Sequence, residues 1–496
     1  MPHPHVVGTI GVVGAGAMGA GVAQTALAAG LTVILHDANP GTLTAAREQI
    51  LSRIARLVEK GQFSEELQDG AERNLQLAET LPALAKAELV IEAIVEKLEV
   101  KQAVFTALEQ IVKPETVLAT NTSSLSVAAI ARSCERRGRV CGMHFFNPVP
   151  LMKLVEVIGG PDTSAETIAR ALALTGRLGK IAVQVKDVPG FLVNFLGRAY
   201  TTEAQHIALE GVAPPAVVDR IMREAAGFRM GPFELMDLTG IDVNFPATTS
   251  IYHGFQHDPR LKPTIMHEAL FNAGRYGRKT GQGFYSYAGG AEAAAPRPHK
   301  PPPGGMTAFL AEPNADLAAL AEKNLSKAGQ ETADVLLIAP NGEDATTACT
   351  RLKLDPARVI AIDLVGVGRR FLTLMTPPGV DGPIQTLAAH LNAQGYSVAT
   401  INDSPGFVAP RILAMIANLG CEAAQIGVGA PADIDLAMRL AQNYPRGPLE
   451  WAAWLGPARV LATLSEIQAI TGSDRYRPSL WLRRRALLGL PIDTAR

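Results

Sequence analysis

One histidine and one glutamate, twelve residues apart, are the best candidates in this chain for moving a proton. His144 lies in a strand-like run at residues 139–146, and Glu156 lies in a second run at residues 154–158, beyond a proline-rich turn. A histidine that accepts a proton needs a partner that fixes its tautomer and stabilises the imidazolium, and a carboxylate does both. Two adjoining strands would bring the pair together. The spacing alone also fits a histidine that caps a loop beside a solvated glutamate.

A glycine-rich turn near the start of the chain predicts a dinucleotide site. A short apolar strand precedes the segment GAGAMG, and a helical run follows it. Gly14 would permit the tight turn, Gly16 would let the backbone approach a pyrophosphate, and Gly19 would let the helix pack against the strand. The free N–H groups of the helix N-terminus would face the phosphates. The expected cofactor contacts are Gly14, Ala15, Gly16, Ala17, Met18 and Gly19. A glycine turn without a ligand is the alternative.

An acidic residue closes the next strand and indicates which dinucleotide is bound. Residues 31–36 read as a strand, and Asp37 stands at its end. A carboxylate at that position accepts from a ribose 2′-hydroxyl and repels a 2′-phosphate, which favours NAD over NADP. The strand, the helix and this acid together are far more specific than the glycines alone.

Composition excludes several classes of protein. The net charge of −1 argues against a nucleic-acid partner. No run reaches the roughly 18 apolar residues of a membrane span, and the first residues lack the charged and apolar regions of a signal peptide. The four cysteines form no CxxC pair, so we expect a reduced, cytoplasmic protein without a metal.

The pattern along the chain predicts an α/β protein with helical domains. Alternating strands and helices predict a Rossmann-like, doubly wound NAD-binding domain at residues 1–186. Helices then dominate residues 187–287, the expected substrate or dimerisation domain. A proline- and glycine-rich linker is expected at residues 288–330, followed by a degenerate α/β segment at 331–402 and a second helical domain at 403–496.

The second helical domain is predicted from an internal repeat. Three motifs recur without gaps at an offset of 216 residues: 403–407 repeats 187–191, 427–431 repeats 211–215, and 447–450 repeats 231–234. Such a match over more than fifty residues indicates a duplication. Before it, residues 358–363 align loosely with residues 139–144.

A long polar helical stretch separates Asp37 from Leu89 and is expected to form a protruding hairpin. It carries Arg47, Arg53, Arg56 and Lys60, which could meet a phosphorylated ligand. A solvated charged face explains the same pattern equally well.

On these motifs the whole chain resembles the 3-hydroxyacyl-CoA dehydrogenases. The first 287 residues carry the motifs of the family, and the duplicated tail, which includes DRYRP at 474–478, resembles the long bacterial members linked to phenylacetate catabolism. The resemblance implies NAD-dependent oxidation of a (3S)-3-hydroxyacyl-CoA thioester to 3-oxoacyl-CoA. The expected substrate is 3-hydroxyadipyl-CoA, and 3-hydroxybutyryl-CoA is the alternative.

The same resemblance implies roles for individual residues. His144 would remove the proton from the substrate 3-hydroxyl, and Glu156 would orient and stabilise it. Ser123 would hydrogen-bond the reacting oxygen, and Asn194 would hold the substrate from the helical domain. The other implied cofactor contacts are Asp37, Glu96, Lys101, Ser123, Asn147 and Lys279.

Two parts of the substrate would lie further away. The resemblance places coenzyme A near Lys60, whereas Arg53 stands where the family has a serine. A distal adipyl carboxylate needs a cation or water when it is buried, and Arg198, one helical turn after Asn194, is the candidate. An ion pair of Arg198 with Glu203 or Glu234 inside its domain is the alternative.

We expect one active site, in a cleft between residues 1–186 and 187–287. The second half should lack another, because Pro410 falls where Asn194 would repeat and Asp363 falls where His144 would align. Its helical domain should pack against the first, as an internal pseudo-dimer, and a homodimer is the other possibility. Two other functions stay open: a Rossmann oxidoreductase acting on a free hydroxy acid, which usually employs a catalytic lysine, and a non-catalytic NAD-binding sensor.

Overall fold

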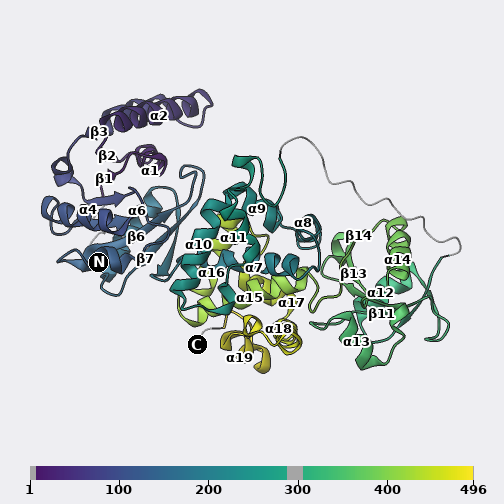
Figure 1. The fold of residues 1–496 in the computed structure, drawn as a ribbon. Helices are drawn as coiled ribbons and strands as arrows, with labels where there is room; N and C mark the ends of the chain where they lie inside the picture. Colours follow the sequence, from purple (N-terminus) through teal and green to yellow (C-terminus); the bar gives the residue numbers. More distant parts are fainter. Residues whose placement is uncertain (1–6, 288–304, 495–496) are drawn as a thin grey trace. The chain divides into compact units, whose positions relative to one another are not determined.

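The computed structural model describes residues 7–287 and 305–494 (Figure 1). Contacts group the chain into two units, Met1–Phe195 with Ile426–Gln442, and Leu196–Gln425 with Asn443–Arg496. No helix in the described ranges is long and apolar enough to span a bilayer.

An eight-stranded sheet, in the order β3-β2-β1-β4-β5-β6-β7-β8, forms the centre of the first unit. Its strands are β1 (Thr9–Val13), β2 (Thr32–His36), β3 (Leu75–Ala78), β4 (Leu89–Glu92), β5 (Val117–Thr120), β6 (Val140–Phe145), β7 (Leu154–Gly159) and β8 (Ile181–Lys186). Neighbouring strands are parallel except β6 and β7. The strand order reverses between β1 and β4, and ligands of doubly wound sheets bind beyond the carboxyl ends of the strands at such a point. The predicted Rossmann-like fold is confirmed.

Helices accompany this sheet. They are α1 (Ala17–Ala28), α2 (Pro40–Glu59), α3 (Glu65–Asn74), α4 (Leu98–Ile111), α5 (Val127–Ala131), α6 (Ala165–Arg177) and α16 (Pro431–Gln442). The contacting pair α2 and α3 is the predicted helical hairpin, and α16, a helix of the second repeat, contacts β7 and β8.

Helices of both repeats make up much of the second unit (Figure 1). The first repeat supplies α7 (Val193–Leu209), α8 (Pro215–Glu224), α9 (Pro232–Thr239), α10 (Ile241–Gly254) and α11 (Ile265–Asn272). The second supplies α15 (Ala409–Gln425), α17 (Pro448–Leu455), α18 (Pro457–Thr471) and α19 (Leu480–Leu488). Both ends of α7 and α15, and both ends of α9 and α17, differ by the same 216 residues that separate the sequence motifs.

The two repeats contact each other through buried ionic groups. Glu203, on α7, accepts from Arg411 on α15 and from Arg475, both at 2.6 Å, and from the hydroxyl of Tyr476 at 2.9 Å. All four side chains are buried. The predicted packing of the second helical repeat against the first is therefore confirmed.

A second sheet, ordered β10-β9-β11-β12-β13-β14, completes this unit. Its strands are β9 (Thr307–Leu310), β10 (Ser326–Lys327), β11 (Val335–Ile338), β12 (Val359–Asp363), β13 (Phe371–Met375) and β14 (Ser397–Thr400), with α12 (Ala315–Asn324), α13 (Ala345–Leu352) and α14 (Gly382–Ala393). Only β12 and β13 are antiparallel neighbours. This repeats the β6–β7 arrangement of the first sheet.

The predicted linker was wrong in its second part. Residues 305–330 include β9, α12 and β10, which belong to the second sheet and its covering layer. Leu317 and Leu320 of α12 are buried in that core. The proline- and glycine-rich composition ends at Gly305, so the α/β segment begins there and not at residue 331. Residues 288–304 lie outside the described residues.

Candidate active site

The strand pair β6–β7 places His144 directly opposite Glu156 in the antiparallel register. Nδ1 of His144 lies 2.6 Å from Oε2 of Glu156. With Nδ1–H donating to the carboxylate, Nε2 is the ring nitrogen left to accept a proton. Glu156 has no exposed surface, so the alternative of a solvated glutamate is excluded.

The second oxygen of Glu156 holds the start of α7. Oε1 accepts from the backbone N–H groups of Leu192 at 3.0 Å and Val193 at 2.9 Å. A buried carboxylate is costly unless its oxygens are paired, and here both are. The carboxylate therefore fixes the imidazole and, through the same group, the segment that carries Asn194.

Aromatic rings flank the histidine. The ring centroid of Phe146 lies 4.5 Å from that of His144, and the centroid of Phe191 lies 5.8 Å away. Phe191 adopts a left-handed backbone with φ of 50°, and Gly190 before it has φ of 74°. Such backbone is costly for a phenylalanine and is kept where the surroundings over-determine it. This turn places one apolar ring beside the imidazole.

Ser123 and Asn194 approach each other across the first unit. The amide of Asn194 donates to the backbone carbonyl of Ser123 at 3.4 Å. Ser123 follows β5, and its own N–H donates to Oε1 of Glu96 at 2.9 Å. Both predicted residues are thus joined in one hydrogen-bonded segment.

Glu96 and Lys101 form a partly buried ionic network with a residue that the sequence did not single out. The ammonium of Lys101 lies 2.6 Å from Glu92 and 3.2 Å from Glu96. Burial acts to raise the pKa of Glu96, but the hydrogen bond from Thr122 and the charge of Lys101 outweigh it, so its pKa is lowered. Lys101 is buried and holds Glu96 in its charged form.

The glycine loop has the geometry that its sequence predicts. Gly14 has φ of 101°, and a Cβ there would lie 2.5 Å from the carbonyl oxygen of Ala93. A Cβ on Gly19 would lie 1.8 Å from the carbonyl oxygen of Gly14. At Gly16, the residue before α1, a Cβ would meet no atom within 4 Å. Gly14 and Gly19 are therefore required by the protein itself, whereas the space at Gly16 is open for a ligand.

Asp37 is tied to this loop. Its Oδ2 accepts from the N–H of Ala15 at 2.8 Å, and its Oδ1 accepts from the N–H of Asn39 at 2.9 Å. The carboxylate thus stands beside the helix N-terminus, as the fingerprint predicts for a ribose-binding acid. The residues present fit NAD. Within the described residues, no group of three metal-ligating side chains is found.

The remaining predicted residues are less closely grouped. Asn147 is exposed directly after β6, and Arg53 and Lys60 are exposed on or at the end of α2. In the second unit, Lys279 forms an ion pair with Asp242.

Arg198 is buried within the second unit, and Nη1 of its guanidinium donates to Thr248 at 2.7 Å. Burial lowers its pKa to about 10. The carboxylates suggested as ion-pair partners bind elsewhere: Glu203 binds Arg411 and Arg475, and Glu234 binds Arg223.

Three positioning residues were missed by sequence reasoning. Glu92 binds Lys101 and Thr120, Asn121 accepts from the N–H of Phe145, and Asp187 accepts from the first turn of α5. Each links segments that are 9 to 60 residues apart. The only available signal was that Glu92 and Asn121 fall at or just after the ends of β4 and β5, where the ligands of such sheets bind.

Comparison with known proteins identifies the family. The description "3-hydroxyacyl-CoA dehydrogenase, NAD binding domain" matches residues 9–188, and "3-hydroxyacyl-CoA dehydrogenase, C-terminal domain" matches both residues 190–287 and 406–491. The chain belongs to the 3-hydroxyacyl-CoA dehydrogenase family. It is an oxidoreductase of this family, and NAD is its cofactor. The double match of the C-terminal domain agrees with the duplicated helices.

Long and short relatives both resemble this family member. The 3-hydroxyadipyl-CoA dehydrogenase of Escherichia coli (strain K12) is 40% identical over 482 residues, covering 97% of this chain and 98% of the relative. A crystal structure of 3-hydroxybutyryl-CoA dehydrogenase from Escherichia coli K12 is 39% identical with a TM-score of 0.88, covering 97% of this chain and 99% of that one. The human mitochondrial hydroxyacyl-coenzyme A dehydrogenase is 39% identical over 289 residues, covering 57% of this chain and 92% of the relative.

Proposed function

We propose that this protein oxidises (3S)-3-hydroxyacyl-CoA thioesters to 3-oxoacyl-CoA and that 3-hydroxyadipyl-CoA is its physiological substrate. The observation that carries the reaction is the 2.6 Å contact between His144 and Glu156 on neighbouring strands. The adipyl group is supported by the full-length similarity to the long relative of that name. In phenylacetate degradation, the pathway suggested by this similarity, such a step would yield 3-oxoadipyl-CoA.

His144 acts as the base in this proposal. Oxidation at C3 removes a hydride from carbon and a proton from the 3-hydroxyl, and NAD when bound accepts the hydride. Nε2 of His144 takes the proton, while Glu156 stabilises the imidazolium that forms. A histidine has a reference pKa of about 6.5, which suits this transfer near neutral pH.

Two polar side chains complete the proposed substrate contacts. Ser123 hydrogen-bonds the oxygen that becomes the ketone, and Asn194 holds the thioester side of the substrate. Their mutual hydrogen bond of 3.4 Å supports a shared task. Closure of the helical domain over the substrate would exclude water and strengthen these contacts.

The cofactor is held by the glycine loop and by charged groups near it. The loop at residues 14–19 and the α1 N-terminus bind the pyrophosphate, and Asp37 binds the adenosine ribose. Glu96, Asn147 and Lys279 are the further contacts that we propose. Lys101 acts indirectly by positioning Glu96, because its ammonium is buried against two carboxylates. Coenzyme A would lie along the exposed basic face of α2, at Arg53 and Lys60.

A shorter acyl group is the second candidate, because the similar Escherichia coli crystal structure is described as a 3-hydroxybutyryl-CoA dehydrogenase. Steady-state kinetics with 3-hydroxyadipyl-CoA and 3-hydroxybutyryl-CoA decides between them by kcat/KM. Reduction of acetoacetyl-CoA by NADH tests the reaction itself. Turnover of a free hydroxy acid, or NADH binding without any turnover, would instead support the other oxidoreductase or the sensor.

The assembly and location of the protein also belong to this proposal. The contacts between the two helical repeats support an internal pseudo-dimer, in which one chain supplies both copies of the helical domain. A cytoplasmic location stays a prediction. Sedimentation at several protein concentrations distinguishes a single chain from a homodimer of chains.

A further inference from the structure

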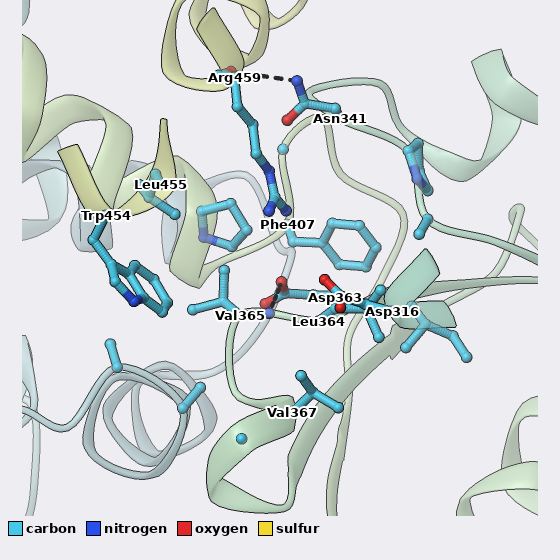
Figure 2. Close-up of a pocket in the computed structure, with 18 of the residues that line it drawn as sticks. Asp316, Asn341, Asp363, Leu364, Val365, Val367, Phe407, Trp454, Leu455 and Arg459 are labelled. Atoms are coloured by element: carbon cyan, nitrogen blue, oxygen red, sulfur yellow. Dashed lines mark hydrogen bonds between the residues drawn. The ribbon is translucent and has the colours of Figure 1, made fainter. Parts of the chain in front are cut away.

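A cavity of about 510 Å³ in the second unit occupies the place that the candidate active site occupies in the first half of the chain (Figure 2). It lies beyond the ends of β11 and β12, which correspond to β5 and β6. Phe407 and Pro410 line it, and they repeat Phe191 and Asn194 at the offset of 216 residues. Its volume falls within the range of small-molecule sites.

The residues that carry the dehydrogenase chemistry are replaced there. Asp363 ends β12 at the place of His144, and the antiparallel register sets Thr373 opposite it, where β7 has Glu156. Pro410 replaces Asn194 and lacks a side-chain donor. The cavity has therefore lost the proposed base and its partner, but it has kept its walls.

Two buried polar atoms in this region are unsatisfied. Asp363 is 3% exposed, and its Oδ1 accepts from the N–H of Val365 at 2.9 Å. Oδ2 of Asp363 and Oγ1 of Thr373 have no hydrogen-bond partner in the part of the chain that is described. Buried polar atoms are normally paired, so each exception points to a missing ligand or water.

The charged groups around the cavity favour an anion. Arg369, Arg446 and Arg459 line it, against the carboxyl groups of Asp316 and Asp363. Figure 2 shows the side chain of Arg459 reaching from α18 toward Asp363 and Phe407. Within the described residues, its guanidinium forms no ion pair. A guanidinium binds a carboxylate with two parallel hydrogen bonds.

Aromatic and apolar groups form another wall. The guanidinium of Arg446 lies 5.4 Å from the ring centroid of Trp451 and 5.1 Å from that of Trp454. Leu455 and Val367 add aliphatic surface. A ligand that fits must therefore combine one anionic end with an apolar body.

We propose that this cavity binds a small organic carboxylate, with its carboxylate held between Arg459 and Asp363 and its hydrocarbon part against Trp454 and Leu455. The site is distinct from the dehydrogenase site. It would make the second half a binding module for a small acid, built on the remains of a duplicated catalytic cleft.

The proposal includes a pH dependence. Burial raises the pKa of Asp363 to about 6, although the N–H of Val365 and the charge of Arg459 oppose the shift. A bound carboxylate would raise that pKa further, because like charges disfavour ionisation. Binding at pH 7 should therefore take up a proton, and affinity should fall on the order of tenfold between pH 6 and pH 8. The other charged groups lining the cavity are Asp316, Arg369, Arg446 and Arg459.

Tryptophan fluorescence of the full-length protein reports on this site, since two of the three tryptophans line it. Adipate and hexanoate are the probes, and inorganic phosphate is the competing oxyanion. We expect saturable fluorescence changes with at least one of the two carboxylates and a much weaker response to phosphate. Calorimetry in buffers of different ionisation enthalpy measures the proton uptake.

Matched variants decide the assignment. Arg459→Gln should weaken carboxylate binding at least tenfold and leave turnover of 3-hydroxyacyl-CoA unchanged. Arg483→Gln, the same change at an exposed position of α19, should leave both unchanged. Asp363→Asn keeps the side-chain volume and should abolish the pH dependence, which keeps the test valid if Arg459→Gln does not fold. Absence of binding by both carboxylates, phosphate binding as tight as theirs, or unchanged affinity in Arg459→Gln would overturn the proposal.

Discussion

Glu156 binds His144 with one oxygen and the backbone entering α7 with the other. The imidazole is therefore oriented by the same carboxylate that holds the segment leading to Asn194. A change at Glu156 should disturb the base and the position of the substrate-holding residue together, whereas a change at His144 should disturb the base alone. The first two predictions separate these effects.

Removing the base should abolish most turnover without affecting cofactor binding. In His144→Ala, kcat should fall by about 10²–10⁴-fold, the typical contribution of a positioned base. The dissociation constant for NADH should stay within about twofold, because the glycine loop and Asp37 lie on other elements. Stopped-flow turnover and fluorescence titration of NADH measure the two quantities. Near-normal turnover in this variant would exclude the proposed mechanism.

Glu156→Gln should have a compound effect. The amide oxygen can still accept one set of hydrogen bonds, but it cannot both bind His144 and accept from Leu192 and Val193 as the charged group does. We expect lower kcat, a shifted pH profile of kcat/KM and a loss of stability of about 1–3 kcal/mol from the unsatisfied buried groups. Thermal unfolding and pH–rate profiles measure these effects. A stability loss with an unchanged pH profile would leave Glu156 a purely structural residue.

The glycine loop offers a matched pair of variants. Gly16→Ala should fold with stability within about 1 kcal/mol of wild type, because its Cβ meets no protein atom, yet it should raise the KM for NAD. Gly19→Ala should destabilise the protein by about 1–3 kcal/mol or more, because its Cβ would overlap the carbonyl of Gly14. Melting temperature and NAD kinetics distinguish them. Unchanged NAD binding in Gly16→Ala would show that the pyrophosphate lies elsewhere.

The sequence predicted the features that depend on local pattern. The central strands β1, β2, β4 and β5 are short apolar runs, and the fingerprint glycines and Asp37 lie where their spacing requires. The duplication was visible because it has no gaps. The edge strands β3 and β8 were missed, since both expose part of their side chains and lack a continuous apolar run.

The ionic contacts of the site were not predictable from the sequence in the same way. Glu92 and Lys101 meet because β4 and α4 pack together, and nothing in their local sequence distinguishes them from solvated charges. The linker was extended too far because composition changes gradually while structure begins abruptly at β9. A contact between distant segments depends on register and packing, which a single sequence does not specify.

The contact between the helical repeats should depend on pH. Burial opposes ionisation of Glu203, but the charges of Arg475 and Arg411 lower its pKa to about 2. Because the folded pKa lies below the value in the unfolded chain, near 4.5, this contribution is complete above pH 4.5. It is lost as pH falls from there toward 2. The melting temperature of wild type should therefore fall steeply in this range.

The matching variants are Glu203→Gln and Glu466→Gln, an exposed glutamate of α18. Glu203→Gln leaves two buried arginines without their carboxylate, so we expect a loss of about 3–5 kcal/mol at neutral pH and a smaller further loss on acidification. Glu466→Gln should behave as wild type. Circular dichroism melts at pH 3 to 7 measure both. Parallel acid profiles in all three proteins would show that Glu203 does not contribute to the acid sensitivity.

The last prediction concerns the distal carboxylate of an adipyl substrate. Arg198 lies on the same helix as Asn194, one turn or about 6 Å further along, so both side chains share a face of α7. Its guanidinium is buried and bonded to Thr248, and the two glutamates that could have neutralised it bind other arginines. If it meets the adipyl carboxylate, Arg198→Met should lower kcat/KM for 3-hydroxyadipyl-CoA more than for 3-hydroxybutyryl-CoA, by about 1–3 kcal/mol. Thr248→Val, which removes only the hydroxyl partner, is the control and should affect both substrates alike. An equal loss on both substrates in Arg198→Met would assign Arg198 to the core of the helical domain and favour the shorter acyl group.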